Sequence, residues 1–263
     1  MSRVRAGILD QPRQRRVPEV RKRGENVTNL PCLLAVFAHP DDESFRCGGM
    51  LALAARRGVR VHLLTATRGE AGMPDDSPMY RPEELAHVHM QELRCACRAL
   101  GIAEPHILEY PDGYLERIDT EELTRTILDE IEMVHPQVLV SFGPDGLSGH
   151  PDHIAVGRCV AAAFEKSEQV AALYTVAVPR SLTEQLGMER VRGVPDECIN
   201  LTVDVSAAWE TKMAAIRCHA TQVRSSPMLW APAERQRAFF GIEHFVRVAC
   251  RHPEQDILAA LFA

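Results

Sequence analysis

The sequence lacks any apolar run long enough to cross a lipid bilayer, which takes about 18–20 residues. Its richest apolar stretches, Leu33–Ala38 and Val138–Phe142, have only the length of strands. The basic segment at the start of the chain also lacks the apolar centre of a secretory signal. We therefore expect a protein that does not insert into a membrane.

Closely spaced cysteine pairs are missing as well. The eight cysteines stand at positions 32, 47, 95, 97, 159, 198, 218 and 250, and no two of them form a CxxC motif. Without such pairs and without a secretory signal, a disulfide framework is not expected. Buried free thiols and a cytoplasmic location are the corresponding predictions.

Net positive charge is absent outside the first 29 residues. That segment holds eight basic and three acidic side chains, so its net charge is +5, while the whole chain has a net charge of −6. We interpret residues 1–30 as a basic, disordered leader and residues 31–263 as a single domain. The acidic remainder argues against nucleic acid as a partner.

Short apolar runs alternate with amphipathic runs of helical length from residue 33 onward. This alternation predicts βαβ units, hence an α/β fold with a Rossmann-like, doubly wound and mainly parallel sheet. The signal weakens after residue 180, which we interpret as a C-terminal elaboration. Expected strands are 33–38, 59–67, 107–110, 138–142, 171–178 and 199–205, and expected helices are 43–57, 83–100, 120–134, 152–166, 207–219 and 233–240. No GxGxxG follows the first strand, which removes the main support for a dinucleotide-binding protein.

Two polar clusters follow predicted strands. The letters AHPDDE occupy positions 38–43, and GHPDH occupies positions 149–153. Ligands of open α/β sheets bind at the carboxyl ends of the strands, so these loops are expected to converge. His39, Asp42 and His153 are the predicted metal ligands, because a catalytic zinc site uses three protein groups and keeps one position open.

Asp41 and His150 remain as acid–base groups beside the predicted metal. A carboxylate there can accept a proton from water, and an imidazole can stabilise an oxyanion or protonate a leaving amine. The residue types therefore predict metal-assisted hydrolysis of an amide. The alternative for each cluster alone is helix capping and turn formation.

The strings AHPDDE, TRGEAG (67–72) and GHPDHIAVG (149–157) resemble the LmbE-like, or GlcNAc-phosphatidylinositol deacetylase (PIG-L), family. The resemblance spans roughly residues 33–178, with weaker agreement at Lys212 and His219–Gln222. It implies an LmbE-like fold, one Zn²⁺ per chain and removal of acetyl groups from N-acetylglucosamine conjugates. It also implies Asp41 as general base, His150 as stabiliser or acid, and Asp152 as the residue that orients His150.

Four further residues are candidates for substrate binding. His89 stands where the family often has the arginine of an R-x-x-E motif, and Asp112 lies near a position that binds sugar hydroxyls. Arg68 follows the second strand, with a solvent-facing loop residue as the alternative. Asp112 and His219 also have ordinary interpretations, as a turn residue and as a structural histidine.

The sequence thus predicts a cytoplasmic, zinc-dependent deacetylase of an amino-sugar conjugate. Fe²⁺ stays open as the metal, and a homo-oligomer stays open as the assembly. The alternatives are a deacylase of a non-sugar amide, suggested by His89, and a non-catalytic metal-binding protein of the same fold.

Overall fold

The structure is a computed structural model that describes residues 30–72, 80–224 and 226–262. Within these ranges one seven-stranded sheet has the strand order β3-β2-β1-β4-β5-β7-β6. The strands are β1 (Cys32–Phe37), β2 (Arg60–Thr67), β3 (His106–Tyr110), β4 (Val138–Phe142), β5 (Ala172–Ala177), β6 (Leu201–Asp204) and β7 (Ile242–Cys250). Strands β1 to β5 run parallel, while β7 is antiparallel to both of its neighbours. The expected mainly parallel α/β sheet is confirmed.

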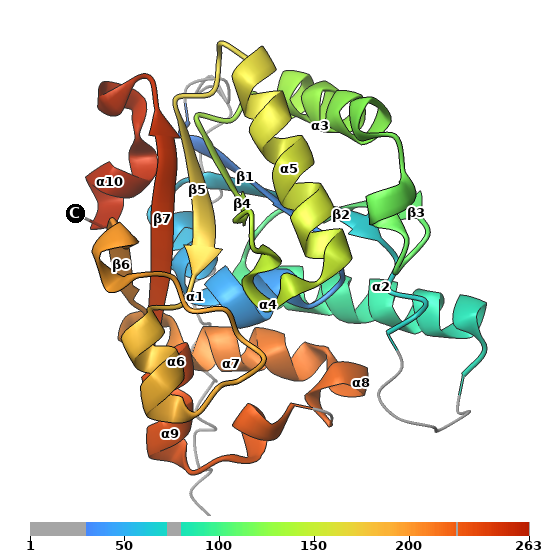
Figure 1. Cartoon of the computed structure of the whole chain (residues 1–263), viewed down its shortest axis with the longest axis vertical. Helices are drawn as coiled ribbons and strands as arrows, with labels where there is room; N and C mark the ends of the chain where they lie inside the picture. Colours follow the sequence, from blue (N-terminus) through green and yellow to red (C-terminus); the bar gives the residue numbers. More distant parts are fainter. Residues whose placement is uncertain (1–29, 73–79, 225, 263) are drawn as a thin grey trace, which may run out of the picture.

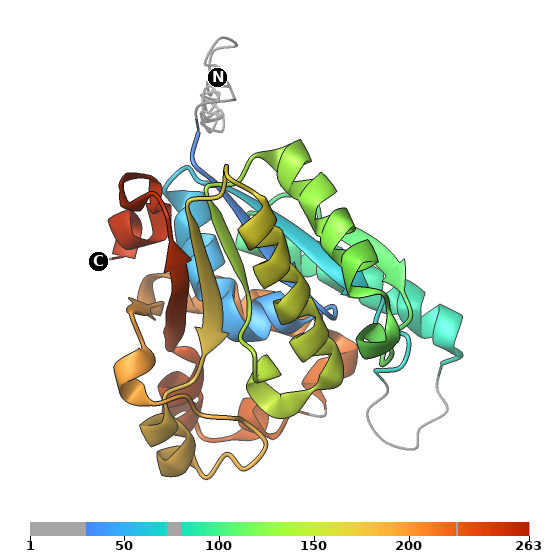
Figure 2. The ribbon, with the colours of Figure 1, turned by 45° about the horizontal axis from the view of Figure 1, so that its top comes forward.

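Helices cover both faces of the sheet (Figures 1 and 2). Helices α3 and α5 pack together on one face, and α1, α2 and α7 pack together on the other. The helices are α1 (Asp42–Arg56), α2 (Pro82–Leu100), α3 (Thr120–Val134), α4 (Gly146–Gly149), α5 (Pro151–Lys166), α6 (Arg180–Leu186), α7 (Trp209–Cys218), α8 (Ala220–Val223), α9 (Ala233–Phe240) and α10 (Ile257–Phe262). Because both faces are covered, every residue of β1 and β4 is buried, and their apolar runs follow from that burial.

The strand order reverses between β1 and β4. From β1 the chain proceeds outward through β2 to β3 and then returns to place β4 on the other side of β1. The loops after these two strands therefore diverge to opposite sides and leave a crevice at their carboxyl ends. Both polar clusters of the sequence follow these two strands.

Close packing sets the position of the two helices that begin in this crevice. A Cβ atom on Gly157 of α5 would lie 2.6 Å from the carbonyl oxygen of Phe142, so only glycine lets α5 approach the end of β4. A Cβ atom on Gly49 of α1 would overlap with the side chain of Val205, as expected for a close-packing glycine.

Strand β7 is the main element that the sequence did not predict. Its exposed residues include Ile242 and Val248, while Glu243 is buried. Phe245 is buried on the same side as Glu243, so apolar and polar residues do not alternate with burial and no strand periodicity marks the segment.

One disulfide also differs from the expectation of free thiols. Cys95 of α2 and Cys218 of α7 are bonded, although 123 positions separate them. The other six cysteines are free, as expected. The pair forms because α2 and α7 pack side by side, which no local spacing reveals.

Two further predictions concern the chain as a whole. No helix of the described residues is long and apolar enough to span a membrane. The predicted leader, 1–30, lies outside the described residues except for Leu30.

Candidate metal and active site

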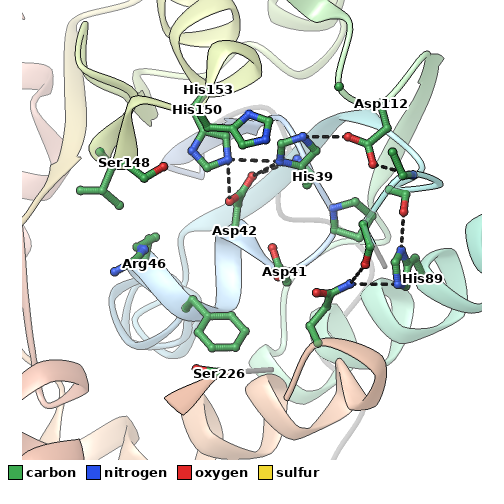
Figure 3. Close-up of a pocket in the computed structure, with 18 residues that line it drawn as sticks. His39, Asp41, Asp42, Arg46, His89, Asp112, Ser148, His150, His153 and Ser226 are labelled. Carbon is green, nitrogen blue, oxygen red and sulfur yellow. Dashed lines mark hydrogen bonds and ion pairs between the residues drawn. The ribbon is translucent and has the colours of Figure 1, made fainter. Parts of the chain in front are cut away.

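The carboxyl ends of β1 and β4 open into a cavity of about 420 Å³ (Figure 3). The rings of His39, after β1, and His150, after β4, have their centroids 4.9 Å apart. The prediction that the two loops converge is therefore confirmed. The labelled side chains of the cavity are His39, Asp41, Asp42, Arg46, His89, Asp112, Ser148, His150, His153 and Ser226.

Three side chains from the two loops direct their donor atoms toward one point. His39 Nδ1 lies 3.1 Å from His153 Nε2 and 3.7 Å from Asp42 Oδ2, and His153 Nε2 lies 3.4 Å from Asp42 Oδ1. Ligand atoms at about 2.1 Å from a tetrahedral zinc ion stand about 3.4 Å from one another. The donor set of His39, Asp42 and His153 therefore fits a metal ion.

Each imidazole makes a hydrogen bond with the ring nitrogen that points away from the proposed metal position, which leaves its other nitrogen available to bind a metal. His153 Nδ1 lies 3.0 Å from the carbonyl oxygen of Gly146, to which it donates. His39 Nε2 lies 3.1 Å from Asp112 Oδ1 and 3.2 Å from Asp152 Oδ2, so it carries the proton on that side. His39 Nδ1 and His153 Nε2, the ring nitrogens that these outer bonds do not use, face each other and are positioned to bind one cation.

Asp152 is a buried anchor for His39. Its carboxylate accepts the backbone N–H groups of Gly113 (2.7 Å) and Leu115 (2.9 Å) as well as the ring N–H of His39. Burial raises the pKa of Asp152, but these hydrogen bonds lower it by a larger amount, so the net shift is downward. Ligand atoms of His39, Asp112 and Asp152 also lie close together, but this existing hydrogen bonding suits the two carboxylates to orienting the ring.

The carboxylate of Asp152 contacts His39, whereas only its backbone N–H contacts His150, the ring that Asp152 was expected to orient. His150 is the N-cap of α5, and its Nδ1 accepts the backbone N–H of Asp152 at 3.2 Å. A first-turn N–H has no partner within its helix, so the capping ring takes it while the carboxylate turns to His39. With Nδ1 accepting, the proton of neutral His150 is on Nε2, the nitrogen that is free to donate.

Asp41 directs its carboxyl group to the cavity and does not cap α1, although it occupies the N-cap position. Burial and the charge of Asp42 raise its pKa to about 8, although His219 and His39 oppose the rise. Its backbone has φ 122° and ψ −29°, a region that residues with a side chain seldom adopt. The strained backbone belongs to a residue expected to be catalytic.

A buried pair behind Asp41 holds this conformation. Glu43 Oε2 accepts the backbone N–H of Asp41 at 3.1 Å, and Glu43 Oε1 accepts from His219 Nε2 at 2.9 Å. Glu43 and His219 are both fully buried. His219 therefore lies behind the cavity wall, and its interpretation as a structural histidine fits better than substrate binding.

The other candidate substrate-binding residues are placed differently. His89 and Asp112 line the cavity, whereas Arg68 is outside it and pairs with Glu109 at 3.4 Å. His89 Nδ1 lies 2.8 Å from the carbonyl oxygen of Gly69, and burial lowers its pKa. A neutral ring at this position does not supply the cation that the arginine of the family motif would provide.

One charged residue of the cavity, Arg46, was not predicted from the sequence. It stands on α1 four positions after Asp42, and this spacing places two side chains on the same helix face. That spacing was the signal that could have found it.

The comparisons with known proteins agree with this site. Residues 34–164 match the PIG-L family, described as GlcNAc-PI de-N-acetylase. A 1D-myo-inositol 2-acetamido-2-deoxy-alpha-D-glucopyranoside deacetylase of Acidothermus cellulolyticus is 33% identical, over 81% of this chain and 87% of the relative. The protein of the same name from Mycobacterium sp. strain JLS is 32% identical, over 88% and 90%.

The chain belongs to the PIG-L family. The predicted family and the predicted enzyme class, a deacetylase, are confirmed by these relatives.

Solved structures confirm the fold of this PIG-L protein. The N,N'-diacetylchitobiose deacetylase of Pyrococcus horikoshii has a TM-score of 0.60 at 23% identity and covers 84% of this chain and 85% of that one. GalB of Pseudomonas putida KT2440, a 4-carboxy-2-hydroxymuconate hydratase, has a TM-score of 0.62 at 21% identity and covers 85% and 98%. Two different reactions on one fold show that the chemistry must be argued from the site.

Proposed function

We propose that this enzyme removes the acetyl group from an N-acetylglucosamine joined to a small polar alcohol, with a GlcNAc-inositol as the first substrate to test. The relatives named for that reaction support the substrate class. The observation that carries the proposal is the convergence of His39, Asp42 and His153 beside the carboxyl group of Asp41. The cavity, at about 420 Å³, has the size of a small-ligand site.

His39, Asp42 and His153 would hold Zn²⁺, for which Fe²⁺ is the alternative. The metal supplies Lewis acidity toward the amide carbonyl and toward water. Asp41 accepts a proton from the water that attacks the carbonyl carbon. His150 donates a hydrogen bond from Nε2 to the oxygen on which charge develops. As the C–N bond breaks, the amine nitrogen takes up the proton that Asp41 accepted from the water, and acetate and the free amino sugar leave.

Asp152 and Asp112 act one step away from this chemistry. Both accept from His39 Nε2 and thereby fix the ring with Nδ1 toward the metal position. Outer hydrogen bonds of this kind set the basicity and orientation of a ligating imidazole. We assign both residues to positioning.

The proposed compartment is the cytoplasm. Six of the eight cysteines are free thiols, as in most cytoplasmic proteins. The Cys95–Cys218 pair makes this location testable, because fractionation followed by thiol labelling would report both the compartment and the state of the pair.

The first experiment measures metal content and released acetate together. Purified protein should contain about one zinc per chain and release acetate from the GlcNAc-inositol, and chelation should abolish the release. Asp41→Asn should lower kcat by about 10²–10⁴-fold while the metal stays bound. Asp129→Asn, the same chemical change at an exposed position of α3, is the matched control. Full activity of Asp41→Asn would refute the assignment of the base.

A non-sugar amide is the second candidate, and His89 is the observation that favours it. Its ring is buried and bonded to Gly69 and Gln222, so no cation is offered to a sugar substituent at this position. A panel of acetylated amines without a sugar separates the candidates. Turnover on that panel with none on acetamido sugars would replace the first proposal by the second, and metal-free, inactive protein would favour a non-catalytic role.

A further inference from the structure

Arg46 is a cation of the cavity wall without a protein counter-ion. It stands on α1 one turn after Asp42 and lines the cavity beside Ser148 (Figure 3). Among residues 30–72, 80–224 and 226–262, no carboxylate lies within ion-pair distance of its guanidinium and no side chain accepts a hydrogen bond from it. Asp41 and Asp42 act on it only at longer range.

The surroundings of Arg46 hold the side chain in place while leaving its donors unused. The guanidinium carbon lies 5.3 Å from the centre of the Phe239 ring, within the range of a cation–π contact. The ring covers one face of the planar group, and the N–H donors around its edge remain for other partners. Burial lowers the pKa of Arg46, but the usual value of an arginine is so high that the group stays charged.

The guanidinium of Arg46 is only half-buried, so its unused N–H donors face the cavity. A fully buried cation of the same part of the fold shows the contrast. Lys212 is fully buried, and its Nζ is paired with Glu243 Oε1 at 2.7 Å and with the carbonyl oxygen of Phe240 at 3.0 Å. The fold thus neutralises Lys212 and leaves Arg46 open toward the cavity.

The two sides of the cavity differ in charge. Arg46 and Ser148 lie on one side of the His39 cluster, and His89 and Asp112 lie on the other (Figure 3). His89 is held by Gly69, and Asp112 is an anion. An anionic group of a ligand is therefore favoured only on the Arg46 side.

We propose that Arg46, with the hydroxyl of Ser148, binds an oxyanion of the substrate, a phosphate monoester or a carboxylate, carried by the part joined to the acetamido sugar. The inference rests on the proposed function, since it names the substrate feature that the same cavity selects. Arginine suits the task, because its planar fork donates two parallel hydrogen bonds to either kind of oxyanion.

The kinetic test compares three glycosides of N-acetylglucosamine. Their aglycones are myo-inositol, myo-inositol monophosphate and glycolate, which are neutral, phosphorylated and carboxylated. Wild-type enzyme should prefer one of the two anions over the neutral glycoside in kcat/KM, and the preferred anion identifies the source of the oxyanion. Arg46→Gln should lower that preference by about 10–100-fold, mainly through KM, and Arg46→Lys should restore part of it. Arg125→Gln, on the exposed face of α3, is the matched control.

A binding test keeps this inference separate from the proposed function. Inositol 1-phosphate and myo-inositol are each titrated calorimetrically into the metal-loaded forms of wild-type protein and Arg46→Gln. Because both proteins carry the metal, any contact of the phosphate with the metal is the same in the two titrations. The phosphate ester should bind wild type about 10–100-fold more tightly than it binds the variant. Equal binding by both proteins would overturn the anion site. Loss of binding in the variant, with no acetate released by wild type from any glycoside, would keep the site and refute the deacetylation proposal.

Discussion

The parallel strands β1 and β4 and the antiparallel strands β6 and β7 contribute to the molecule in different ways. The loops after β1 and β4 carry the side chains that converge on the cavity, and these side chains reach solvent or each other. The segment from β6 to β7 carries buried polar side chains that reach back to α1. Glu243 of β7 accepts the backbone N–H groups of Gly49 and Met50, and His219 bonds to Glu43.

This difference teaches that the chemistry and the rigidity of the site come from separate parts of the chain. Helix α1 begins with the carboxylates proposed to bind the metal and to act as the base, and its middle packs against β7 and α7. Substitutions in the first part should change metal binding and turnover, while substitutions in the second should change the stability of the fold. Four variants test this division, in order of decreasing effect.

Asp42→Asn should have the largest effect, through the metal. It removes one of three proposed ligands, so the loss of metal affinity should exceed the about 10–100-fold typical of an outer hydrogen-bond partner. Metal content after dialysis and acetate release measure the change, with Asp129→Asn as control. The unfolding midpoint of metal-free protein should stay close to that of wild type, and a metal-loaded, active variant would contradict the ligand set.

Glu243→Gln should act on stability. It leaves the ammonium group of Lys212 without a counter-charge in the core, a change that typically lowers the free energy of unfolding by about 3–5 kcal/mol. Urea titration followed by circular dichroism measures it, and Glu168→Gln at an exposed position is the matched control. A variant as stable as wild type but inactive would break the proposed division.

Asp152→Asn should weaken the metal site without unfolding the protein. The amide accepts less strongly from His39 Nε2 and orients the ring less firmly, so metal affinity should fall by about 10–100-fold. Competition with a chelator gives the dissociation constant. An effect as large as that of Asp42→Asn would indicate that Asp152 is itself a ligand.

His219→Gln should produce the smallest effect, and one that depends on pH. Burial lowers the pKa of His219, but Glu43 raises it through charge and hydrogen bonding, and the net shift is upward. A histidine whose pKa is raised on folding contributes its full stabilisation at pH values below its pKa in the unfolded chain, about 6.5. This contribution disappears as the pH rises through the pKa of the folded state. The stability difference between wild type and variant should therefore shrink from pH 6 to pH 9 in urea titrations. A difference that grows with pH would contradict the assignment of a protonated His219.

The proposed ligands and the base could be predicted because their signal is local. His39 and Asp42 follow β1 closely, His153 lies in the first turn of α5 in the segment after β4, and the carboxyl ends of parallel strands share one edge. The fold class followed for the same reason, from alternating runs of strand and helix length.

The remaining features depend on packing between distant segments. The Asp152 carboxylate had two histidines within reach, and only the capping of α5 by His150 decides between them. Strand β7 buries Glu243 and exposes Ile242, so its sequence does not show the apolar pattern by which a strand is recognised. The sequence alone does not show which distant segments pack together, so it cannot predict these two features.

The unusual backbone of Asp41 implies a conflict between catalysis and folding stability. A non-glycine residue at φ 122° costs about 1–3 kcal/mol, and the hydrogen bond from its N–H to Glu43 offsets part of that cost. Asp41→Gly should therefore melt at a higher temperature than wild type while losing the proposed base, a gain that calorimetry would measure. A substitution at this one position would then raise stability and remove activity together. Selection for thermostable variants of this enzyme should therefore exclude changes at residue 41.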